Sequence, residues 1–458
     1  MKGPFIRTAA PENTSGGTLE NPENPNLYRD IFPYSEVCRI PFDGNIEEPE
    51  LPENIWITDT TFRDGMQARP PYSVEQIVRI FTLLNRLGGP DGLIRASEFF
   101  LYSDKDRKAV EECLSLGLEY PLITGWIRAV SSDFELVKQM ELEETGILTS
   151  ASDYHIFKKL GKTREEALQG YIEIIEEALK AGIRPRCHFE DITRADFYGF
   201  VIPFAHEIVR LSEESGTKIK VRLCDTLGYG VPYPGAALPR SVPKLVKGLI
   251  QDGGLAPEQL EWHGHNDFHK VLVNAATAWL YGCCGANGTL LGLGERTGNP
   301  PIEGLVIEYI GLTGRDDAAD TEVIAEIAEY YRDAIGYDIP AAYPFVGENF
   351  NVTRAGIHAD GALKDEEIYS IFDTATILGS PAGVTVTDKS GAAGIAFWIN
   401  DNILKDRDMV IDKRTPGILK IYEWVADQYE QGRTTGISNT ELFEKVKEFL
   451  PELFEEDE

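Results

Sequence analysis

The chain has 458 residues, of which 42% are hydrophobic and 26% charged. This composition excludes a disordered or fibrous protein and fits one large domain with a smaller one. The formal net charge of −31 argues against a nucleic-acid or anionic-membrane partner, since either would be repelled. The six cysteines lack C-x-x-C spacing, and we find no signal-peptide core and no membrane-length apolar run. We therefore expect a cytoplasmic protein with reduced thiols.

Residues 1–50 are rich in Pro, Asn, Glu and Gly and predict an extended N-terminal arm. Short apolar or β-branched runs then alternate with amphipathic stretches. Strands are predicted at 55–58, 93–100, 120–124, 147–150, 184–189, 219–224, 260–263 and 285–290. Helices are predicted at 73–87, 106–116, 132–144, 163–181, 198–215, 239–252 and 270–281. Eight such strands predict an α/β protein with a (β/α)8 barrel over residues 51–313, rather than an open doubly wound sheet.

Three further regions are predicted after the barrel. Residues 314–345 form a helical linker, and residues 346–400 form a compact C-terminal α/β subdomain. Residues 401–458 are predicted to be a helical acidic tail, whose dense final acidic run is solvated.

Two segments about 200 residues apart predict a metal site. Asp64 lies in the sequence DTTFRDGMQ, just after the first predicted strand. His263 and His265 are two positions apart, so on a strand both side chains point to the same face. One carboxylate and two imidazoles are a common set for a divalent metal with open positions for substrate. The alternative is a salt bridge at the strand end, with the histidines hydrogen-bonded to the backbone.

Asn299 is predicted as a fourth metal ligand. It ends the glycine-rich stretch GLGERTGN, whose G-x-G-x-x-x-G spacing differs from that of a dinucleotide loop and indicates a tight barrel turn. A mixed oxygen and nitrogen set suits Mn²⁺, Mg²⁺, Co²⁺ or Zn²⁺, and the absence of a thiolate ligand favours Mn²⁺.

Arg63 precedes the metal carboxylate and is predicted to stabilise an enolate or alkoxide oxygen. The alternative for Arg63 is a structural ion pair with Glu190 or Glu295.

The fifth and sixth predicted strands end in polar residues that suggest a substrate carboxylate. Arg186 and His188 share one face of the fifth strand, so both are expected to reach the same group. Thr226 offers a hydroxyl in a glycine-rich turn after the sixth strand and is predicted as a second contact.

Together these motifs resemble the DRE-TIM metallolyase superfamily in its Claisen-condensing branch, which includes isopropylmalate, homocitrate and Re-citrate synthases. The resemblance runs from about residue 55 to residue 394. It rests on T-x-R-D-G-x-Q at 61–67, E-D-x-x-R at 190–194, D-T-x-G at 225–228, H-x-H-N-D at 263–267, G-E-R-x-G-N at 294–299 and the segment 356–369.

The resemblance implies a metal-dependent condensation of acetyl-CoA with a 2-oxo acid, with Gln67 of the first motif among the substrate-binding residues. It also implies a domain-exchanged homodimer in which His358 and Tyr369 act in the partner subunit's barrel. Glu190, His358 and Tyr369 are the candidates for proton transfer, and the sequence does not decide which of them is the base.

The 2-oxo acid is predicted from Arg186, because the homocitrate branch uses an arginine there for a distal carboxylate. Residues 396–458 are too few for the leucine-sensing domain usual in isopropylmalate synthases. The arm and departures at 93–100, Leu291, 388–391 and 397–400 look most like Re-citrate synthases.

The expected substrate is oxaloacetate, because Phe99 and Phe100 add bulk where relatives have Gly-Phe-Pro. The usual glutamate of that strand is interpreted as displaced, and Arg95 either adds a cation to the pocket or faces outward. The alternatives are 2-oxoglutarate, 2-oxoisovalerate, and a metal-dependent aldolase or lyase on the same barrel.

Overall fold

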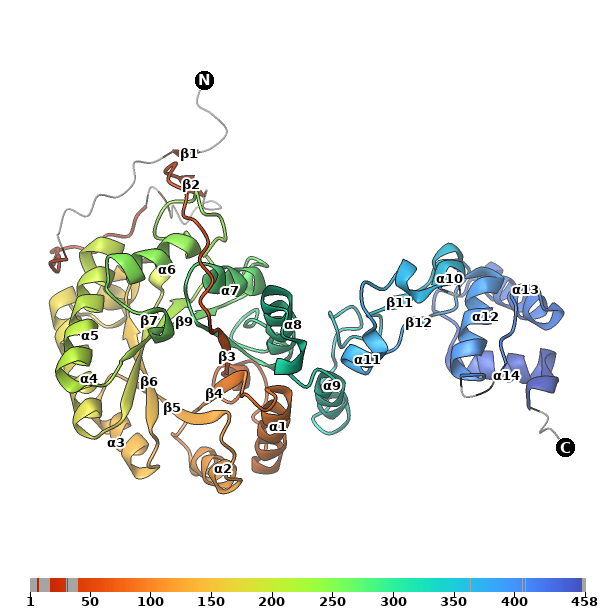
Figure 1. The fold of residues 1–458 in the computed structure, drawn as a ribbon, viewed down its shortest axis with the longest axis horizontal. Coiled ribbons are helices and arrows are strands. Elements are labelled where there is room, and N and C mark those ends of the chain that lie inside the picture. The colour runs from red at the N-terminus through yellow and green to blue at the C-terminus, as the bar shows by residue number, and fades with distance from the viewer. Residues whose placement is uncertain are drawn as a thin grey trace. The chain divides into compact units, whose positions relative to one another are not determined.

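The computed structural model describes residues 6–7, 17–29, 31, 40–362, 364–405, 407 and 409–454. Much of the predicted arm before residue 40, and the acidic run at 455–458, therefore lie outside the described residues. The chain divides into two compact units, Met1–Asp320 and Thr321–Glu458 (Figure 1). Within the first unit, β1 (Ile6–Arg7) pairs with β2 (Pro41–Phe42) in a short parallel ladder.

Unit 1 is a closed barrel of parallel strands. Its strands are β3 (Trp56–Asp59), β4 (Ile94–Phe99), β5 (Leu122–Arg128), β6 (Glu144–Ser150), β7 (Arg184–Glu190), β8 (Lys220–Asp225), β9 (Leu260–Gly264) and β10 (Gly285–Gly288). Each strand pairs with the next in the sequence, and β10 closes the barrel against β3. The predicted (β/α)8 barrel is confirmed.

Helices surround these strands on the outside of the barrel (Figure 1). They are α1 (Val74–Leu87), α2 (Asp104–Ser115), α3 (Ser131–Gln139), α4 (Arg164–Lys180), α5 (Ile202–Ser215), α6 (Val242–Gln251), α7 (Val271–Leu280) and α8 (Ile302–Thr313). Helix α1 shows why they form where predicted. Ser73 accepts a hydrogen bond from the backbone N–H of Gln76, and Ile77 and Leu84 lie on the buried face.

Short helical turns follow several strands at their C-terminal ends. They are η1 (Gly65–Ala68), η2 (Tyr154–Lys159), η3 (Ile192–Arg194), η4 (Phe197–Val201) and η6 (Leu290–Gly292), with η5 (Pro257–Gln259) before β9 and η7 (Asp316–Ala318) after α8. The turns after the strands contribute residues to the end of the barrel where such folds bind substrate.

The barrel interior is unusually polar, which explains one difference from the predicted strands. β6 begins at Glu144, whereas the apolar pattern placed its start at residue 147. Glu144 is fully buried and pairs with Arg186 on β7 and with Lys220 on β8. A search for apolar runs misses a strand whose interior residue is a paired carboxylate.

Unit 2 is a helical unit with one short parallel ladder. Its elements are α9 (Val323–Asp333), β11 (Val352–Thr353), α10 (Gly356–Ala362), η8 (Glu366–Ile368), α11 (Thr374–Leu378), β12 (Gly383–Val384), α12 (Gly391–Asn402), α13 (Pro416–Glu430), α14 (Asn439–Phe449) and η9 (Pro451–Phe454). One core contains Ile399 of α12, Ile421 of α13 and Val446 of α14. The structure thus groups 346–400 and 401–454 together, because the amphipathic tail helices bury their apolar faces.

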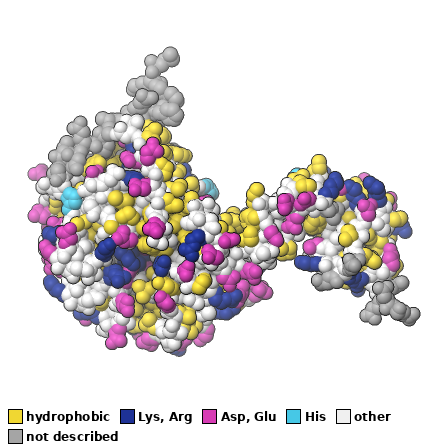
Figure 2. Space-filling view, in the orientation of Figure 1, with side chains coloured by type: hydrophobic (Ala, Val, Ile, Leu, Met, Phe, Trp, Pro, Cys, Tyr) yellow, Lys and Arg dark blue, Asp and Glu magenta, His cyan; other side chains and the backbone are white. Residues whose placement is uncertain are grey.

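Acidic side chains are spread over the visible face of both units (Figure 2). No helix in the described ranges is long and apolar enough to cross a membrane. The five cysteines in those ranges are buried free thiols.

Candidate active site

Asp64, His263 and His265 come together in unit 1. Asp64 follows β3, His263 lies on β9 and His265 directly follows that strand. The Nε2 atoms of His263 and His265 lie 3.4 and 3.6 Å from Asp64 Oδ2. All three side chains are buried, and their ligand atoms lie close enough together for one metal ion.

The other ring nitrogen of each histidine already has a partner. His263 Nδ1 lies 2.7 Å from Asn287 Oδ1, and the amide nitrogen of Asn287 donates to Thr58, which orients that oxygen as an acceptor. His265 Nδ1 lies 3.3 Å from the carbonyl of Glu295. With Nδ1 as donor, each Nε2 presents its lone pair toward Asp64, as in metal sites oriented by outer hydrogen bonds. This geometry favours the metal site over the alternative of backbone-satisfied histidines.

Asn299 contacts the segment that carries the two histidines. Its amide nitrogen donates to the carbonyl of Gly264, between the two histidines, at 3.1 Å. Its Oδ1 is buried and has no hydrogen-bond partner among the described residues. A buried amide oxygen normally has a partner, so this oxygen suits a ligand from outside the protein. The carboxylate and two imidazoles that the structure brings together fit a divalent metal.

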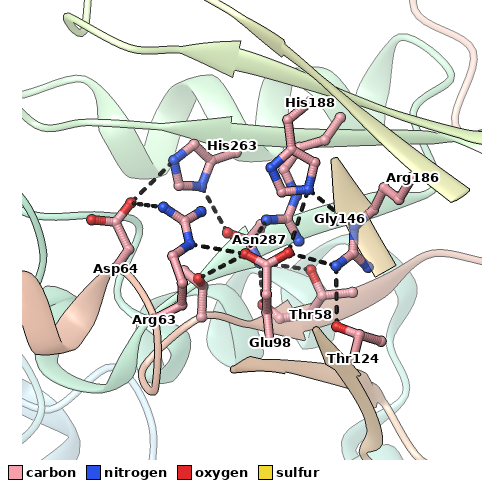
Figure 3. Close-up of polar contacts among 12 residues, drawn as sticks. Thr58, Arg63, Asp64, Glu98, Thr124, Gly146, Arg186, His188, His263 and Asn287 are labelled. Carbon is pink, nitrogen blue, oxygen red and sulfur yellow. Dashed lines mark hydrogen bonds and ion pairs between the residues drawn. The ribbon is translucent and has the colours of Figure 1, made fainter. Parts of the chain in front are cut away.

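Arg63 lies beside this group and is held by two carboxylates (Figure 3). Its Nη1 is 3.2 Å from Asp64 Oδ2, and its Nε is 3.0 Å from Glu98 Oε1. Burial alone would raise the pKa of Asp64, but Arg63 and the histidines outweigh it and hold that pKa well below its usual range. The alternative partners considered for Arg63, Glu190 and Glu295, are wrong.

Glu98, on β4, is the centre of the buried polar network in Figure 3. Its carboxylate accepts hydrogen bonds from Arg63, from Arg222 at 2.9 Å and from Arg186 at 2.6 Å. Burial opposes ionisation, but Arg222 and the other two arginines outweigh it and lower the pKa of Glu98 far below its ordinary value. Glu98 faces the barrel interior, so the strand carries an inward glutamate that acts in the site network.

Arg186 points inward as predicted. It lies near the N-terminal end of β7 and is only 1% exposed. It donates to Glu98, to Glu144 at 2.7 Å and to Thr124 at 3.1 Å. Its Nε donates to His188 Nε2 at 3.3 Å. Four N–H groups of Arg186 are thus used inside the protein, and strand periodicity could not indicate this depth.

His188 lies above Arg186 and is 1% exposed. Burial and the neighbouring arginines hold its pKa well below its ordinary value, so the imidazole is neutral. A side chain on Gly146 would meet this ring, because a Cβ there would lie 2.6 Å from His188 Nε2.

Glu190, at the end of β7, is the centre of a second charged cluster, which we call the Glu190 corner and which includes His155 and Lys159. Lys159 Nζ lies 2.7 and 2.9 Å from its two oxygens, and His155 Nδ1 lies 3.0 Å from Oε2. Ser150 also donates to it. Burial would raise the pKa of Glu190, but His155 and Lys159 outweigh burial and lower it to about 2. Glu190 is therefore an ionised carboxylate.

The remaining predicted residues are distributed over both units. Thr226 Oγ1 accepts the backbone N–H of Asp191 at 2.8 Å, next to Glu190, and Gln67 is exposed in η1. His358 and Tyr369 both belong to unit 2, where their ring centroids are 4.5 Å apart.

The two phenylalanines at the end of β4, which were expected to add bulk to the pocket, have different surroundings. Phe99 stacks on Phe62 at 4.7 Å and contacts Phe81 of α1, so its ring faces the helix layer. Arg95 donates to the hydroxyl of Tyr120 and lies over that ring, away from the metal group. Alternation along the strand directs Glu98 inward and Phe99 outward, so the bulk expected from Phe99 is wrong. Phe100 packs edge-on against Trp126, whose ring lies 5.5 Å from the guanidinium of Arg63, so Phe100 stays on the side of the site.

Several site residues were missed from the sequence. Glu98, Glu144 and Arg222 face the interior of the barrel, and alternation along each strand would have identified them. His155 and Lys159 lie four residues apart in the turn after β6. Their position directly after a strand end was the available signal.

A closed parallel barrel with a carboxylate and two histidines at the C-terminal ends of its strands defines a metal-dependent TIM-barrel enzyme. Residues 54–330 match the HMGL-like family model, and the chain belongs to that family.

Two curated relatives are similar over most of the chain. A Citrate (Re)-synthase of Syntrophus aciditrophicus is 61% identical over 96% of this chain and 70% of its own length. A Citrate (Re)-synthase of Clostridium kluyveri is 53% identical over 96% of this chain and 97% of its own length. Among solved structures, the HMG-CoA lyase of Bacillus subtilis aligns with a TM-score of 0.51 at 20% identity, over 63% of this chain and 96% of its own. That likeness shows the shared fold.

Proposed function

We propose that this protein is a citrate synthase of the Re type, which condenses acetyl-CoA with oxaloacetate. The balanced reaction joins acetyl-CoA, oxaloacetate and water to give citrate and free CoA. The observation that supports it best is identity of 61% and 53% to two enzymes named Citrate (Re)-synthase, each over 96% of the chain. The buried residues Asp64, His263 and His265 suit a Lewis-acidic metal ion, and Arg63 beside them suits a negative oxygen. The condensation needs both.

Asp64, His263, His265 and Asn299 would hold the divalent metal, and we favour Mn²⁺. When bound, such an ion acts as a Lewis acid toward the ketone of a 2-oxo acid. Arg63 uses two of its five N–H groups on Asp64 and Glu98. We propose that its other N–H groups stabilise the negative oxygen that develops during attack, where buried donors act most strongly.

The proton of the acetyl methyl group needs a base other than Glu190, whose pKa is lowered to about 2. We propose His358 as this base, with Tyr369 beside it. Both line a pocket of about 650 Å³ in unit 2, together with Arg354 and Glu366. Glu190 then serves as a fixed carboxylate that orients substrate or water rather than as the primary base.

The family resemblance supports a homodimer in which His358 and Tyr369 serve the barrel of the partner subunit. We also propose a cytoplasmic location, where acetyl-CoA and 2-oxo acids are available.

The function is tested with purified protein, Mn²⁺ and acetyl-CoA, by following CoA release with oxaloacetate, 2-oxoglutarate and 2-oxoisovalerate in parallel. We expect the highest kcat/KM with oxaloacetate, and citrate as the product. Preference for 2-oxoglutarate would indicate homocitrate synthesis, and preference for 2-oxoisovalerate would reject a dicarboxylic substrate.

The metal assignment is tested with His265→Ala. This variant loses one imidazole ligand from a four-residue set, so we expect loss of both bound metal and turnover, measured by elemental analysis and CoA release. His206→Ala is a matched control, because His206 lies on α5 and bonds to the backbone of Asp252. Stoichiometric metal in His265→Ala would contradict the assignment.

A further inference from the structure

An N-terminal segment, residues 17–29, lies against the side of the barrel beside the Glu190 corner. We call it the arm segment. The backbone N–H of Glu20 donates to Gly199 at 3.0 Å, and the carbonyl of Glu20 accepts from Arg164 at 3.3 Å. Asn21 exchanges hydrogen bonds with Glu165 at the start of α4. The segment is therefore attached at several points to the elements that follow β6 and β7.

The arm segment also contacts the two residues that open turn η2. The backbone N–H of Asn26 donates to Asp153 Oδ2 at 2.8 Å. The hydroxyl of Tyr154 donates to the carbonyl of Leu27 at 2.7 Å, and the guanidinium of Arg29 lies 5.8 Å from the centre of the Tyr154 ring.

Asp153 is itself held in place by Arg164 of α4. Arg164, which is 1% exposed, binds both oxygens of Asp153 at 2.8 Å and reaches Asp196 at 3.0 Å. Tyr28 lies near this group, and burial together with Asp196 raises its pKa. Its φ of 45° is unusual for a residue other than glycine. Such a backbone persists only where surrounding contacts determine it, so the conformation of the arm segment is specified.

Turn η2 connects these contacts to the Glu190 corner. His155 and Lys159, on the same turn as Tyr154, bind the carboxylate of Glu190. The Tyr154 ring lies 4.0 Å from the guanidinium of Arg194, which in turn binds Asp191 at 2.8 Å. The contacts that fix Tyr154 therefore also fix the partners of Glu190 and of its neighbour Asp191.

We propose that the arm segment is a positioning element for this reaction. By binding Asp153 and Tyr154, it fixes turn η2, so that His155 and Lys159 hold Glu190 in one orientation at the substrate-binding end of the barrel. The arm segment itself contributes no reacting group. This inference rests on the proposed function only for the step from the Glu190 corner to substrate.

The test is Tyr154→Phe, which removes the hydroxyl that binds Leu27 and keeps the aromatic ring over Arg194. We expect the KM for oxaloacetate to rise about three- to ten-fold, the range of one net hydrogen bond, with little change in the KM for acetyl-CoA or in metal content. Tyr429→Phe is the matched control, because the Tyr429 hydroxyl also donates to a backbone carbonyl, that of Thr435, within unit 2. This control is expected to keep wild-type kinetics.

Hydrogen exchange tests, independently of activity, whether the arm segment fixes turn η2. Tyr154→Phe should speed exchange of the η2 amides, including those of Ile156 and Leu160, which are bonded to Ser152 and His155. Faster exchange with an unchanged KM for oxaloacetate would overturn the positioning role. Unchanged exchange would overturn the hold itself. If the wild-type protein does not turn over oxaloacetate, the proposed function fails, while the exchange result still decides whether the arm segment fixes the turn.

Discussion

One carboxylate, Glu98, organises much of the site at the scale of single residues. It is 1% exposed and accepts hydrogen bonds from three arginines, among them Arg63 beside the metal group. Buried ion pairs add little net stability compared with an apolar core, but removing one partner leaves charges uncompensated. The network is therefore better explained by orientation of Arg63 than by stability.

Glu98→Gln keeps the shape of Glu98 and removes its charge. We expect a loss of about 3–5 kcal/mol of stability near neutral pH, because the arginines lose their buried counter-charge. The pKa of Glu98 is depressed in the folded protein, so its contribution is present above the ordinary value and is lost as pH falls through the folded one. Unfolding in denaturant should therefore show a gap between wild type and variant that narrows below about pH 4.3. A gap independent of pH would contradict this account.

Arg186 has two distinguishable roles. If one of its internal bonds exchanges for a substrate carboxylate, Arg186→Gln should raise the KM for the 2-oxo acid about ten- to a hundred-fold and leave the KM for acetyl-CoA unchanged. We expect this result, together with lower thermal stability, because Glu98 and Glu144 each lose a buried ion pair with Arg186. Lower stability with an unchanged KM would assign Arg186 to the barrel interior alone.

The sequence predicted the types of residue at the site better than their depth. Asp64, His263 and His265 were correctly grouped, because a pair two positions apart on a strand has one orientation. The depth of Arg186 and the central position of Glu98 depend on the register between strands, which one sequence does not reveal.

At the scale of elements, the barrel was predictable and the turns after its strands were not. The apolar faces of helices such as α4 repeat with the helical period, and all eight strands were located. Turn η2 is a π-helical turn with mixed polar and apolar residues, for which no simple periodicity exists. Yet this turn supplies two partners of Glu190.

Lys159→Met tests what turn η2 does for Glu190. Without the ammonium group, burial should raise the pKa of Glu190 from about 2. If turnover needs the ionised carboxylate, the acid limb of the kcat/KM profile should then move to higher pH. Lys158→Met is the matched control, since it removes the same charge one residue earlier, where Lys158 lies over the ring of Tyr154. An acid limb shared by both variants and wild type would show that ionisation of Glu190 does not limit catalysis.

At the scale of the whole molecule, the candidate catalytic groups are divided between two compact units. The metal group and Arg63 belong to Met1–Asp320, whereas His358 and Tyr369 belong to Thr321–Glu458. The amphipathic pattern of the tail helices predicted that they are helical, but not that they share a core with α12. The apolar pattern of a helix shows which face is buried, but not which other helix it packs against.

A domain-exchanged dimer predicts complementation between two inactive variants. Asp64→Ala damages the barrel of its own chain, and His358→Ala damages the group donated to the partner. A hybrid of the two has one site with both defects and one intact site. Random exchange makes about half of the dimers hybrid, so the mixture should recover about a quarter of wild-type activity.

A mixture of Asp64→Ala with His263→Ala is the control, because both changes affect the barrel and every site in the hybrid keeps a defect. Native mass spectrometry would measure the hybrid fraction, and CoA release the activity. Hybrids that form in the expected proportion and remain inactive would show that His358 acts in the active site of its own chain. Recovery only in the first mixture would require each active site to combine the barrel of one chain with unit 2 of the other.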